Sequence, residues 1–342
     1  MRDAAVAGHA PSQIPLTKQD GTEVNSAATF SEASIAYGET LAELISEDQP
    51  VVVVEADVMK ASGGAFVLES YPNHVVQVGI AEQNAVGVGA GLAQMGLIPF
   101  VNTFAVTLSR RAADQVWQAV AFNRTNVKLN GMYSGFTAEE NGATHQALED
   151  LAIMRAYPGM VILEPADCHE LRQAVRAAVE YTGPLYLRNS RIKLPDICDM
   201  NQPPLVIGEA AMLRTGDDVT IIASGIMLQY ALKAHDVLAA EGISARVVNP
   251  RTIKPLDEKT VLGCAKETGA VVTVEDHNVI GGLGDAVASL LSENWPTPLK
   301  RVGIRDKFGN SGSFSHLIGA YGMDVPDIVS AAREVLQRKS AY

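Results

Sequence analysis

The stretch "HVVQVGIAEQNAVGVGAGLAQMGLIPFVNTFA", residues 74–105, contains the pattern that decides the fold. Two short apolar runs, 74–79 and 98–105, flank a longer segment of small and apolar residues. Buried strands that alternate with helices are typical of a parallel sheet covered on both faces. The longer segment starts with Glu82, so the pattern predicts a single carboxylate at the beginning of an otherwise apolar helix.

The same alternation continues on both sides of this stretch. Further strand candidates in the first half of the chain are 51–57, 126–132, 160–165 and 184–188. Helical spacing is found in 109–123 and 167–181. After a segment rich in proline and polar residues, strand patterns return at 218–225, 244–250 and 270–277, with helices expected from about residues 227 and 256 and after a glycine-rich turn.

These patterns predict an α/β protein with two doubly wound domains. We expect a first domain over 29–195, a linker over 196–206 and a second domain over 207–342, preceded by a flexible polar tail over 1–28. The chain has 342 residues, which is enough for two domains of ordinary size.

Composition and charge exclude several classes of partner. The formal net charge of −12 disfavours nucleic acid and anionic membranes, because both require clustered Lys and Arg. No apolar run approaches the roughly 20 residues that span a bilayer, and the first residues lack the apolar core of a signal peptide. Three widely separated cysteines fit neither a zinc site nor a disulfide framework. We therefore predict a cytoplasmic protein with reduced thiols.

A glycine-rich turn offers one misleading signal. Gly282 and Gly284 follow a strand pattern and precede a helix pattern, as in a dinucleotide-binding fingerprint. The third glycine position is occupied by Val287, so the match is incomplete. A tight turn is the favoured interpretation, and a nicotinamide-dependent dehydrogenase remains the alternative from another functional class.

Polar and aromatic residues gather where the predicted strands end. Asp57, Glu82 and Phe104 each lie at or shortly after a strand, and His145 lies at a loop-to-helix junction with the helix expected from Thr144 or His145. Each of these residues alone could be an ordinary cap or core residue. Because the carboxyl ends of parallel strands share one edge of a sheet, together they predict one crevice with a functional site.

Three segments carry a resemblance to a known family: residues 71–105, 142–167 and 251–289. They resemble the C-terminal half of the transketolase group of thiamine diphosphate enzymes, over roughly residues 30 to 340. The resemblance implies a pyrimidine-binding domain followed by a C-terminal domain. The family's G-D-G…N motif, which holds Mg²⁺ and the diphosphate in a third domain, is not found. The likeness therefore implies a split enzyme whose separate N-terminal subunit supplies the Mg²⁺ ligands, with no metal ligands on this chain, in an α2β2 assembly.

The resemblance also implies roles for the residues at the strand ends. The glutamate at the position of Glu82 hydrogen-bonds N1′ of the aminopyrimidine and so promotes removal of the proton from the thiazolium C2. Phe104 is expected to stack on the pyrimidine, Asp57 to lie near the cofactor, and His145 to contact the substrate and assist proton transfer. Three further positions are expected to face the cofactor: Ile80, Thr107 and Arg110. Relatives commonly have aromatic residues at the last two.

Departures from the family pattern concern the substrate. Asn141 stands where enzymes acting on sugar phosphates often have aspartate. Arg188 and Arg191 lie near the family's phosphate-binding arginine, with the register open, and Lys60 adds another cation. We therefore predict ketol transfer from a non-standard ketose to an aldose or aldehyde acceptor. A β-subunit of a 2-oxoacid dehydrogenase, an enzyme like deoxyxylulose-phosphate synthase and a non-catalytic scaffold remain alternatives.

Overall fold

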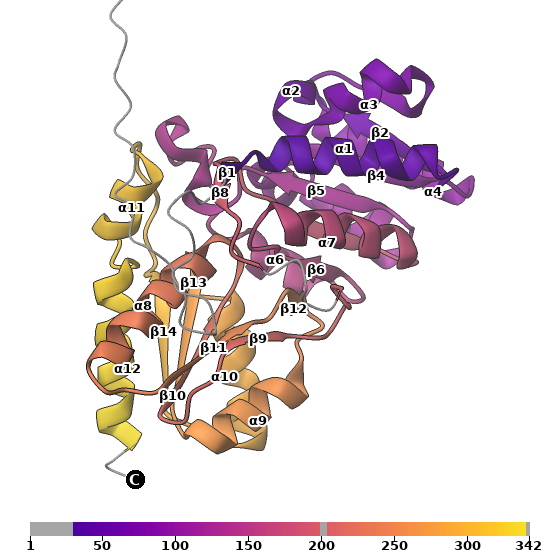
Figure 1. Cartoon of the computed structure of the whole chain (residues 1–342). Helices are drawn as coiled ribbons and strands as arrows, with labels where there is room; N and C mark the ends of the chain where they lie inside the picture. Colours follow the sequence, from indigo (N-terminus) through magenta and orange to yellow (C-terminus); the bar gives the residue numbers. More distant parts are fainter. Residues whose placement is uncertain (1–29, 199–203, 340–342) are drawn as a thin grey trace, which may run out of the picture.

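The computed structural model describes residues 30–198 and 204–339. The predicted tail over 1–28 lies outside these residues, as does part of the predicted linker. The described chain forms two α/β units that lie one above the other in Figure 1, the indigo-to-magenta half over the orange-to-yellow half. Each unit is built around one twisted sheet.

The first sheet has seven strands in the order β12-β6-β7-β5-β4-β2-β3. Their bounds are β2 Val51–Glu55, β3 Val75–Gln77, β4 Ile98–Phe104, β5 Lys128–Met132, β6 Val161–Leu163, β7 Leu185–Arg188 and β12 Thr252–Lys254. All pairings among β2 to β7 are parallel. The predicted parallel sheet is therefore confirmed, and the carboxyl ends of six strands meet at one edge.

Both faces of this sheet are covered, as its apolar strands require. Within β2, Val53 packs into the cluster on one face and Val54 into the cluster on the other, as the two-residue period of a strand dictates. One face carries α1 Ala33–Ser46, α3 Gly64–Ser70 and α7 Cys168–Glu180. The other carries α4 Glu82–Gln94, η3 Val116–Phe122 and α6 Asp150–Ala156.

Short elements lie at the edges of the first sheet. They are β1 Phe30–Ser31, α2 Met59–Ser62, η1 Pro72–His74, η2 Thr107–Arg111, α5 Ala113–Gln115, η4 Gly135–Asn141 and β8 Leu194–Pro195. Strand β1 pairs with β8 in an antiparallel two-stranded sheet, which fixes the start of the described chain beside the end of the first unit.

The second sheet has five strands in the order β14-β13-β10-β11-β9. Their bounds are β9 Ala211–Arg214, β10 Val219–Ala223, β11 Ala245–Asn249, β13 Val271–Asn278 and β14 Leu299–Ile304. One face is covered by η5 Gly225–Met227, α8 Leu228–Ala240, α11 Phe314–Ala320 and α12 Val325–Lys339, and the other by α9 Glu258–Thr268 and α10 Leu283–Asn294. Its only antiparallel pairing among the described residues joins the edge strand β9 to β11.

The two units share structure across their boundary. Strand β12 comes from the second half of the chain but pairs antiparallel with β6 of the first sheet. One apolar cluster joins Leu151 and Met154 of α6 to Val261 of α9 and Leu283 of α10. The predicted second domain therefore contributes a strand and part of a core to the first.

One predicted helix start is wrong. The helix expected from Thr144 or His145 begins at Asp150, and residues 143–145 form a turn. The reason is a long-range pairing, because Ala147 bridges to Ser134 and its carbonyl accepts a 3.0 Å hydrogen bond from the Gly135 amide. His145 is therefore carried by a loop rather than by a helix.

Candidate active site

Glu82 is the first residue of α4 and is almost completely buried, with 4% of its surface exposed. Its two carboxylate oxygens accept hydrogen bonds from one nitrogen of Arg111, Nη1, at 2.7 and 2.8 Å. The small residues of α4 allow the helix to lie close to the sheet. A Cβ atom on Gly89 would come within 2.6 Å of the Val101 side chain in β4. The sheet edge thus holds a carboxylate beneath an arginine.

Arg111 ends η2, a π-helical segment that starts just after β4. Such segments occur frequently at functional sites. Thr107, the first residue of η2, donates from its hydroxyl to the Phe104 carbonyl at 2.9 Å and lies 2.9 Å from the Thr103 hydroxyl. Thr107 therefore stabilises the end of β4, and its contact with a cofactor stays a prediction.

An aromatic cluster lies at the ends of neighbouring strands. The ring of Phe104 is 4.9 Å from that of Tyr133 and 5.7 Å from the imidazole of His145, measured between centroids. The guanidinium of Arg191 lies 4.9 Å from the Tyr133 ring centroid, within cation–π range. The structure therefore brings together three residues predicted for the site, and Tyr133 links two of them, Phe104 and Arg191.

Tyr133 was not among the residues predicted from sequence. It directly follows β5 and has a φ of 56°, an uncommon backbone conformation for a residue other than glycine. Such strained residues cluster at functional sites. A signal was present, since an aromatic residue follows a strand and precedes Ser-Gly at the same sheet edge as the other candidates.

The loop that carries His145 is held by Arg110. The Arg110 Nη2 atom donates to the Gln146 carbonyl at 3.3 Å, and its Nε atom pairs with the Glu149 carboxylate. His145 itself lies 3.0 Å from the Thr144 hydroxyl through Nδ1. The described contacts of Arg110 are thus with this loop, while its predicted contact with the cofactor remains untested.

A cavity of about 410 Å³ opens beside the aromatic cluster. It is lined by Glu32, Ser34, Lys60, Ala61, Tyr133, Glu139, Ser190, Arg191, Ile192 and Lys193. Lys193 is paired with Glu32 at 3.2 Å. The buried hydroxyl oxygen of Ser190 has no partner among the described residues. Two cations predicted for substrate binding, Lys60 and Arg191, therefore line one cavity that could hold an anionic group.

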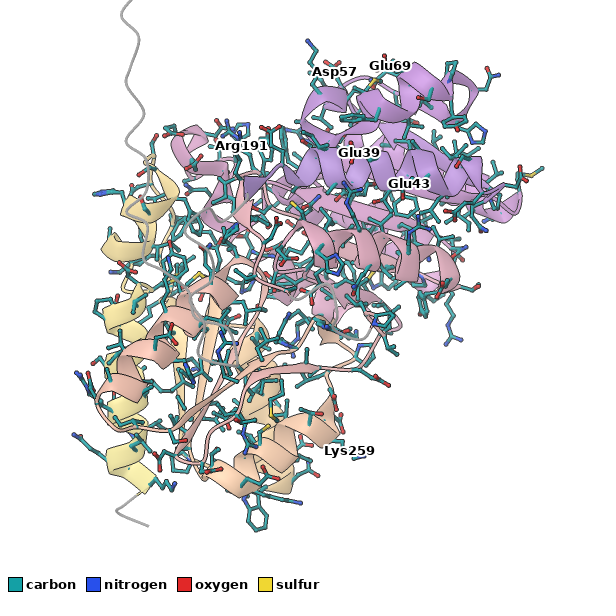
Figure 2. The ribbon with its side chains drawn as sticks, in the orientation of Figure 1. Glu39, Glu43, Asp57, Glu69, Arg191 and Lys259 are labelled. Carbon is teal, nitrogen blue, oxygen red and sulfur yellow. The ribbon has the colours of Figure 1, made fainter. Side chains whose placement is uncertain are left out.

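Three other predicted residues lie at exposed positions. Asp57 follows β2 with a φ of 61°, and its amide donates to Gln77 Oε1 at 2.9 Å. Figure 2 shows Asp57 and Arg191 at the same end of the molecule, opposite Lys259 of α9. Ile80 is 75% exposed, and Asn141 is exposed at the end of η4. These side chains are accessible to a ligand or a partner subunit.

Arg188 differs from the other candidates because it is enclosed by the protein, with 2% of its surface exposed. It donates to the carboxylates of Asp150 at 2.8 Å and Glu164 at 2.5 Å and to the carbonyls of Ala147 and Asp276. Burial alone would raise the pKa of Asp150, but Arg188 and His277 lower it. Because the protein encloses Arg188, its side chain is not accessible to a substrate and belongs to the contact between the two units.

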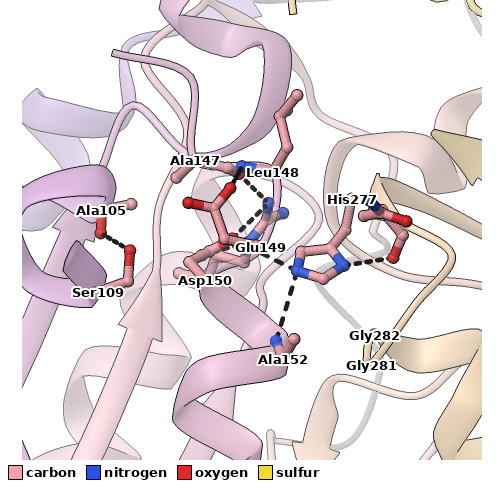
Figure 3. A network of polar contacts seen from close by, with 12 residues as sticks. Ala105, Ser109, Ala147, Leu148, Glu149, Asp150, Ala152, His277, Gly281 and Gly282 are labelled. Carbon is pink, nitrogen blue, oxygen red and sulfur yellow. Dashed lines mark hydrogen bonds and ion pairs between the residues drawn. The ribbon is translucent and has the colours of Figure 1, made fainter. Parts of the chain in front are cut away.

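The contact between the units continues at His277, which Figure 3 shows next to Asp150 and Ala152. His277 of β13 is fully buried, and its Nδ1 atom lies 2.6 Å from the Asn278 carbonyl. Its Nε2 atom lies 3.4 Å from the Ala152 amide and 3.9 Å from Asp150. The first turn of α6, which follows the His145 loop, is thus fixed against the second sheet.

The glycine-rich turn at 281–284 binds a side chain of its own chain. The carboxylate of Glu275 accepts from the Leu283 amide at 2.7 Å and the Gly284 amide at 2.9 Å. A Cβ atom on Gly282 would lie 1.9 Å from Glu275 Oε2. Because these amides are already used, the turn offers no phosphate site, and the dinucleotide-binding alternative loses its support.

Two kinds of feature are absent from the described part of the chain. Across residues 30–198 and 204–339, no group of three or more His, Cys, Asp or Glu side chains could hold a metal ion. No helix in these ranges is both long and apolar enough to cross a membrane.

Comparison with known proteins agrees with this architecture. The family model for the transketolase pyrimidine-binding domain matches residues 32–196, and that for the transketolase C-terminal domain matches residues 208–328. The chain is 46% identical over 304 residues to the 6-deoxy-6-sulfo-D-fructose transketolase subunit SqwH of a Clostridium species, covering 89% of this chain and 94% of that protein. It is 37% identical over 303 residues to an apulose-4-phosphate transketolase subunit of Phocaeicola vulgatus, covering 89% and 97%.

A solved structure shows the same fold. It is a split-gene transketolase described as an inactive β4 tetramer, with a TM-score of 0.83 and 40% sequence identity, covering 90% of this chain and 99% of that one. The two domain matches, the relatives that this chain covers over 94% and 97% of their length, and the shared fold lead to one conclusion. The chain belongs to the transketolase family and contains its pyrimidine-binding and C-terminal domains.

Proposed function

We propose that this subunit binds the aminopyrimidine of thiamine diphosphate and transfers a two-carbon ketol unit from a ketose that carries an anionic group. The observation that supports this best is the shared sheet edge, where the buried carboxylate of Glu82 lies near a π-helical segment that begins just after Phe104. The Phe104 ring in turn contacts His145 and Tyr133.

The residues present fit the pyrimidine end of the cofactor. Glu82 would accept or share the proton at N1′, Phe104 would stack on the ring, and the exposed Ile80 would add apolar surface. When bound, thiamine diphosphate supplies the electron sink for cleavage of a carbon–carbon bond. Asp57, Thr107 and Arg110 remain proposed neighbours of the cofactor.

The diphosphate end requires another subunit. The glycine-rich turn of this chain is filled by Glu275. We therefore propose that a separate N-terminal subunit binds the diphosphate and holds Mg²⁺, in an α2β2 complex. A cytoplasmic location also stays a prediction, and the three cysteines, which are buried and form no disulfide within the described residues, are compatible with it.

His145 and the cavity beside it would handle the substrate. The His145 imidazole is partly exposed at the cluster and would move a proton at a substrate hydroxyl. Lys60 and Arg191 would hold the anionic group of the ketose, and Asn141 would offer a hydrogen bond to a hydroxyl. Two relatives are described as acting on sugars with a sulfonate or a phosphate, which agrees with an anionic donor.

The test is reconstitution with the adjacent-gene N-terminal subunit, thiamine diphosphate and Mg²⁺. Turnover would be compared for 6-deoxy-6-sulfofructose, apulose 4-phosphate, xylulose 5-phosphate and the uncharged ketose fructose. We expect turnover with at least one charged donor and much lower turnover with fructose. Equal turnover with fructose would refute the anionic site, and absence of turnover in a complex that binds the cofactor would refute the proposed substrate class.

A further inference from the structure

The inference concerns the contact between Glu82 and Arg111. Within the described residues, the Glu82 oxygens accept hydrogen bonds only from Arg111 Nη1. The Arg111 side chain is 55% exposed, whereas that of Glu82 is 5% exposed. The guanidinium therefore lies on the open side of the carboxylate.

This position conflicts with the proposed use of Glu82. A hydrogen bond to the aminopyrimidine needs one of the two oxygens that Arg111 now occupies. Because protein covers the other sides of Glu82, a ring must approach from the side on which Arg111 lies. The guanidinium and the ring thus compete for the same place.

The contact is built so that it can be released. Arg111 uses only one of its three nitrogens in the hydrogen bonds found within residues 30–198 and 204–339. Its neighbour Arg110 contacts both the Glu149 carboxylate and the Gln146 carbonyl, so it is anchored at two points. Because Arg111 is half exposed, water can hydrate the guanidinium once it leaves, which lowers the cost of breaking the pair. The remaining cost falls on the buried Glu82 carboxylate, and the hydrogen bond to the aminopyrimidine offsets it.

We propose that Arg111 is a place-holding cation, which neutralises Glu82 in the cofactor-free subunit and leaves when the aminopyrimidine binds. This inference rests on the proposed cofactor site. It assigns Arg111 a role opposite to that of a binding residue, because the arginine opposes cofactor binding instead of assisting it.

The test is the affinity for thiamine diphosphate, measured by isothermal titration calorimetry with Mg²⁺ on the co-expressed two-subunit complex. We expect Arg111→Met to lower Kd by about twofold to fivefold, the effect of losing one competing ion pair whose arginine is half exposed. Arg333→Met removes an ion pair between Glu241 and an arginine of α12 that is about as exposed as Arg111, and it is the control, for which we expect the wild-type Kd. If Arg111→Met does not fold, Arg111→Gln tests the same prediction, because glutamine also removes the positive charge.

Two outcomes would overturn the proposal. An unchanged Kd would show that the guanidinium does not compete, and a higher Kd would show that Arg111 is part of the bound site. If the wild-type complex assembles but does not bind thiamine diphosphate, the proposed function fails instead, which separates the two conclusions. High salt should also reduce the difference between wild type and Arg111→Met, because salt screens an exposed ion pair.

Discussion

The two sheets carry similar acidic residues but use them differently. At the edge of the first sheet, Glu82 lies under a half-exposed arginine, and a cavity lined by cations lies at the same edge. In the second sheet, Glu275 and Asp276 of β13 are fully buried, and backbone amides from Leu283, Gly284 and Phe136 donate to their carboxylates. A buried carboxylate therefore indicates a site only when its partner can leave.

The second sheet also explains why motif matching misleads. Its glycine-rich turn has the shape of an anion site, but the carboxyl group of Glu275 from the same chain occupies it. Asp276 of β13, together with Arg188 and His277, joins the two units instead of binding a ligand. The comparison predicts that changes at the first edge alter activity, whereas changes at the second alter stability.

The largest effect is expected from Glu82→Gln. The amide keeps the shape of the side chain but cannot take up a proton, so kcat should fall by about 10²–10⁴-fold. The measurement is steady-state turnover of the reconstituted complex, with size-exclusion chromatography to show that assembly is intact. Turnover close to the wild-type rate in an intact complex would refute the proposed role of Glu82.

Arg188→Met should mainly affect stability. The change leaves Asp150 and Glu164 buried without their cation, and loss of one partner of a buried pair costs about 3–5 kcal/mol. Urea unfolding of the subunit measures this loss. The control is Arg176→Met, which removes exposed pairs with Glu43 and Glu47 and should cost less than about 1 kcal/mol. Equal losses in both variants would contradict the structural role of Arg188.

Arg191→Met tests the cavity at the first edge. We expect KM for a charged ketose to rise about tenfold, which corresponds to about 1.4 kcal/mol, with little change in kcat. Lys193→Met is the matched control within the same cavity. Because Glu32 already neutralises Lys193, its effect on KM should be smaller. A larger rise in KM from Lys193→Met than from Arg191→Met would show that Lys193, not Arg191, holds the anionic group.

The last expected effect, spread over several pH units, is a change in the pH dependence of stability at the second sheet. Burial raises the pKa of Glu275 to about 8 from the ordinary value of 4.5. Between these values the folded protein holds a proton that the unfolded chain has released, so stability should fall as pH rises through this window. One proton changes the slope by at most about 1.4 kcal/mol per pH unit.

Glu275→Gln should therefore flatten this fall in the free energy of unfolding between pH 5 and 8, as measured by urea unfolding. The variant also loses one accepting oxygen, which lowers stability at every pH but leaves the slope unaffected. Asp276, whose pKa burial raises to about 7, should retain part of the pH dependence. If the free energy of unfolding of Glu275→Gln fell with pH as steeply as that of the wild type, the proposed protonation of Glu275 in the folded protein would be contradicted.

Much of the fold was predictable because it depends on local pattern. Strands β2 to β7 of the first sheet lie within the strand candidates that the sequence indicates, and the period of two in β2 accounts for both covered faces. Strand β12 was not predicted, since its three residues pair with a strand about ninety positions earlier in the chain. The helix start at Asp150 was missed for the same reason, because the Ser134–Ala147 bridge is not visible in a local window.

The candidate site also contains both residues that the sequence indicates and residues that only the fold reveals. Glu82, Phe104 and His145 were identifiable from strand ends and from family likeness, and Phe104 and His145 lie in contact. Arg111 was missed because its partner is 29 positions away. Arg188 was predicted at the substrate because a sequence shows charge but not burial. Tertiary partners decide which charged side chains remain available to a ligand.

The crossing of β12 into the first sheet has a consequence for how such a polypeptide can be cut or recombined. A fragment ending before residue 252 would expose the backbone hydrogen-bonding groups of β6 along a bare sheet border, where other molecules can attach. If the C-terminal half is exchanged between relatives, the incoming half must therefore bring a strand β12 that can pair with β6 of the recipient.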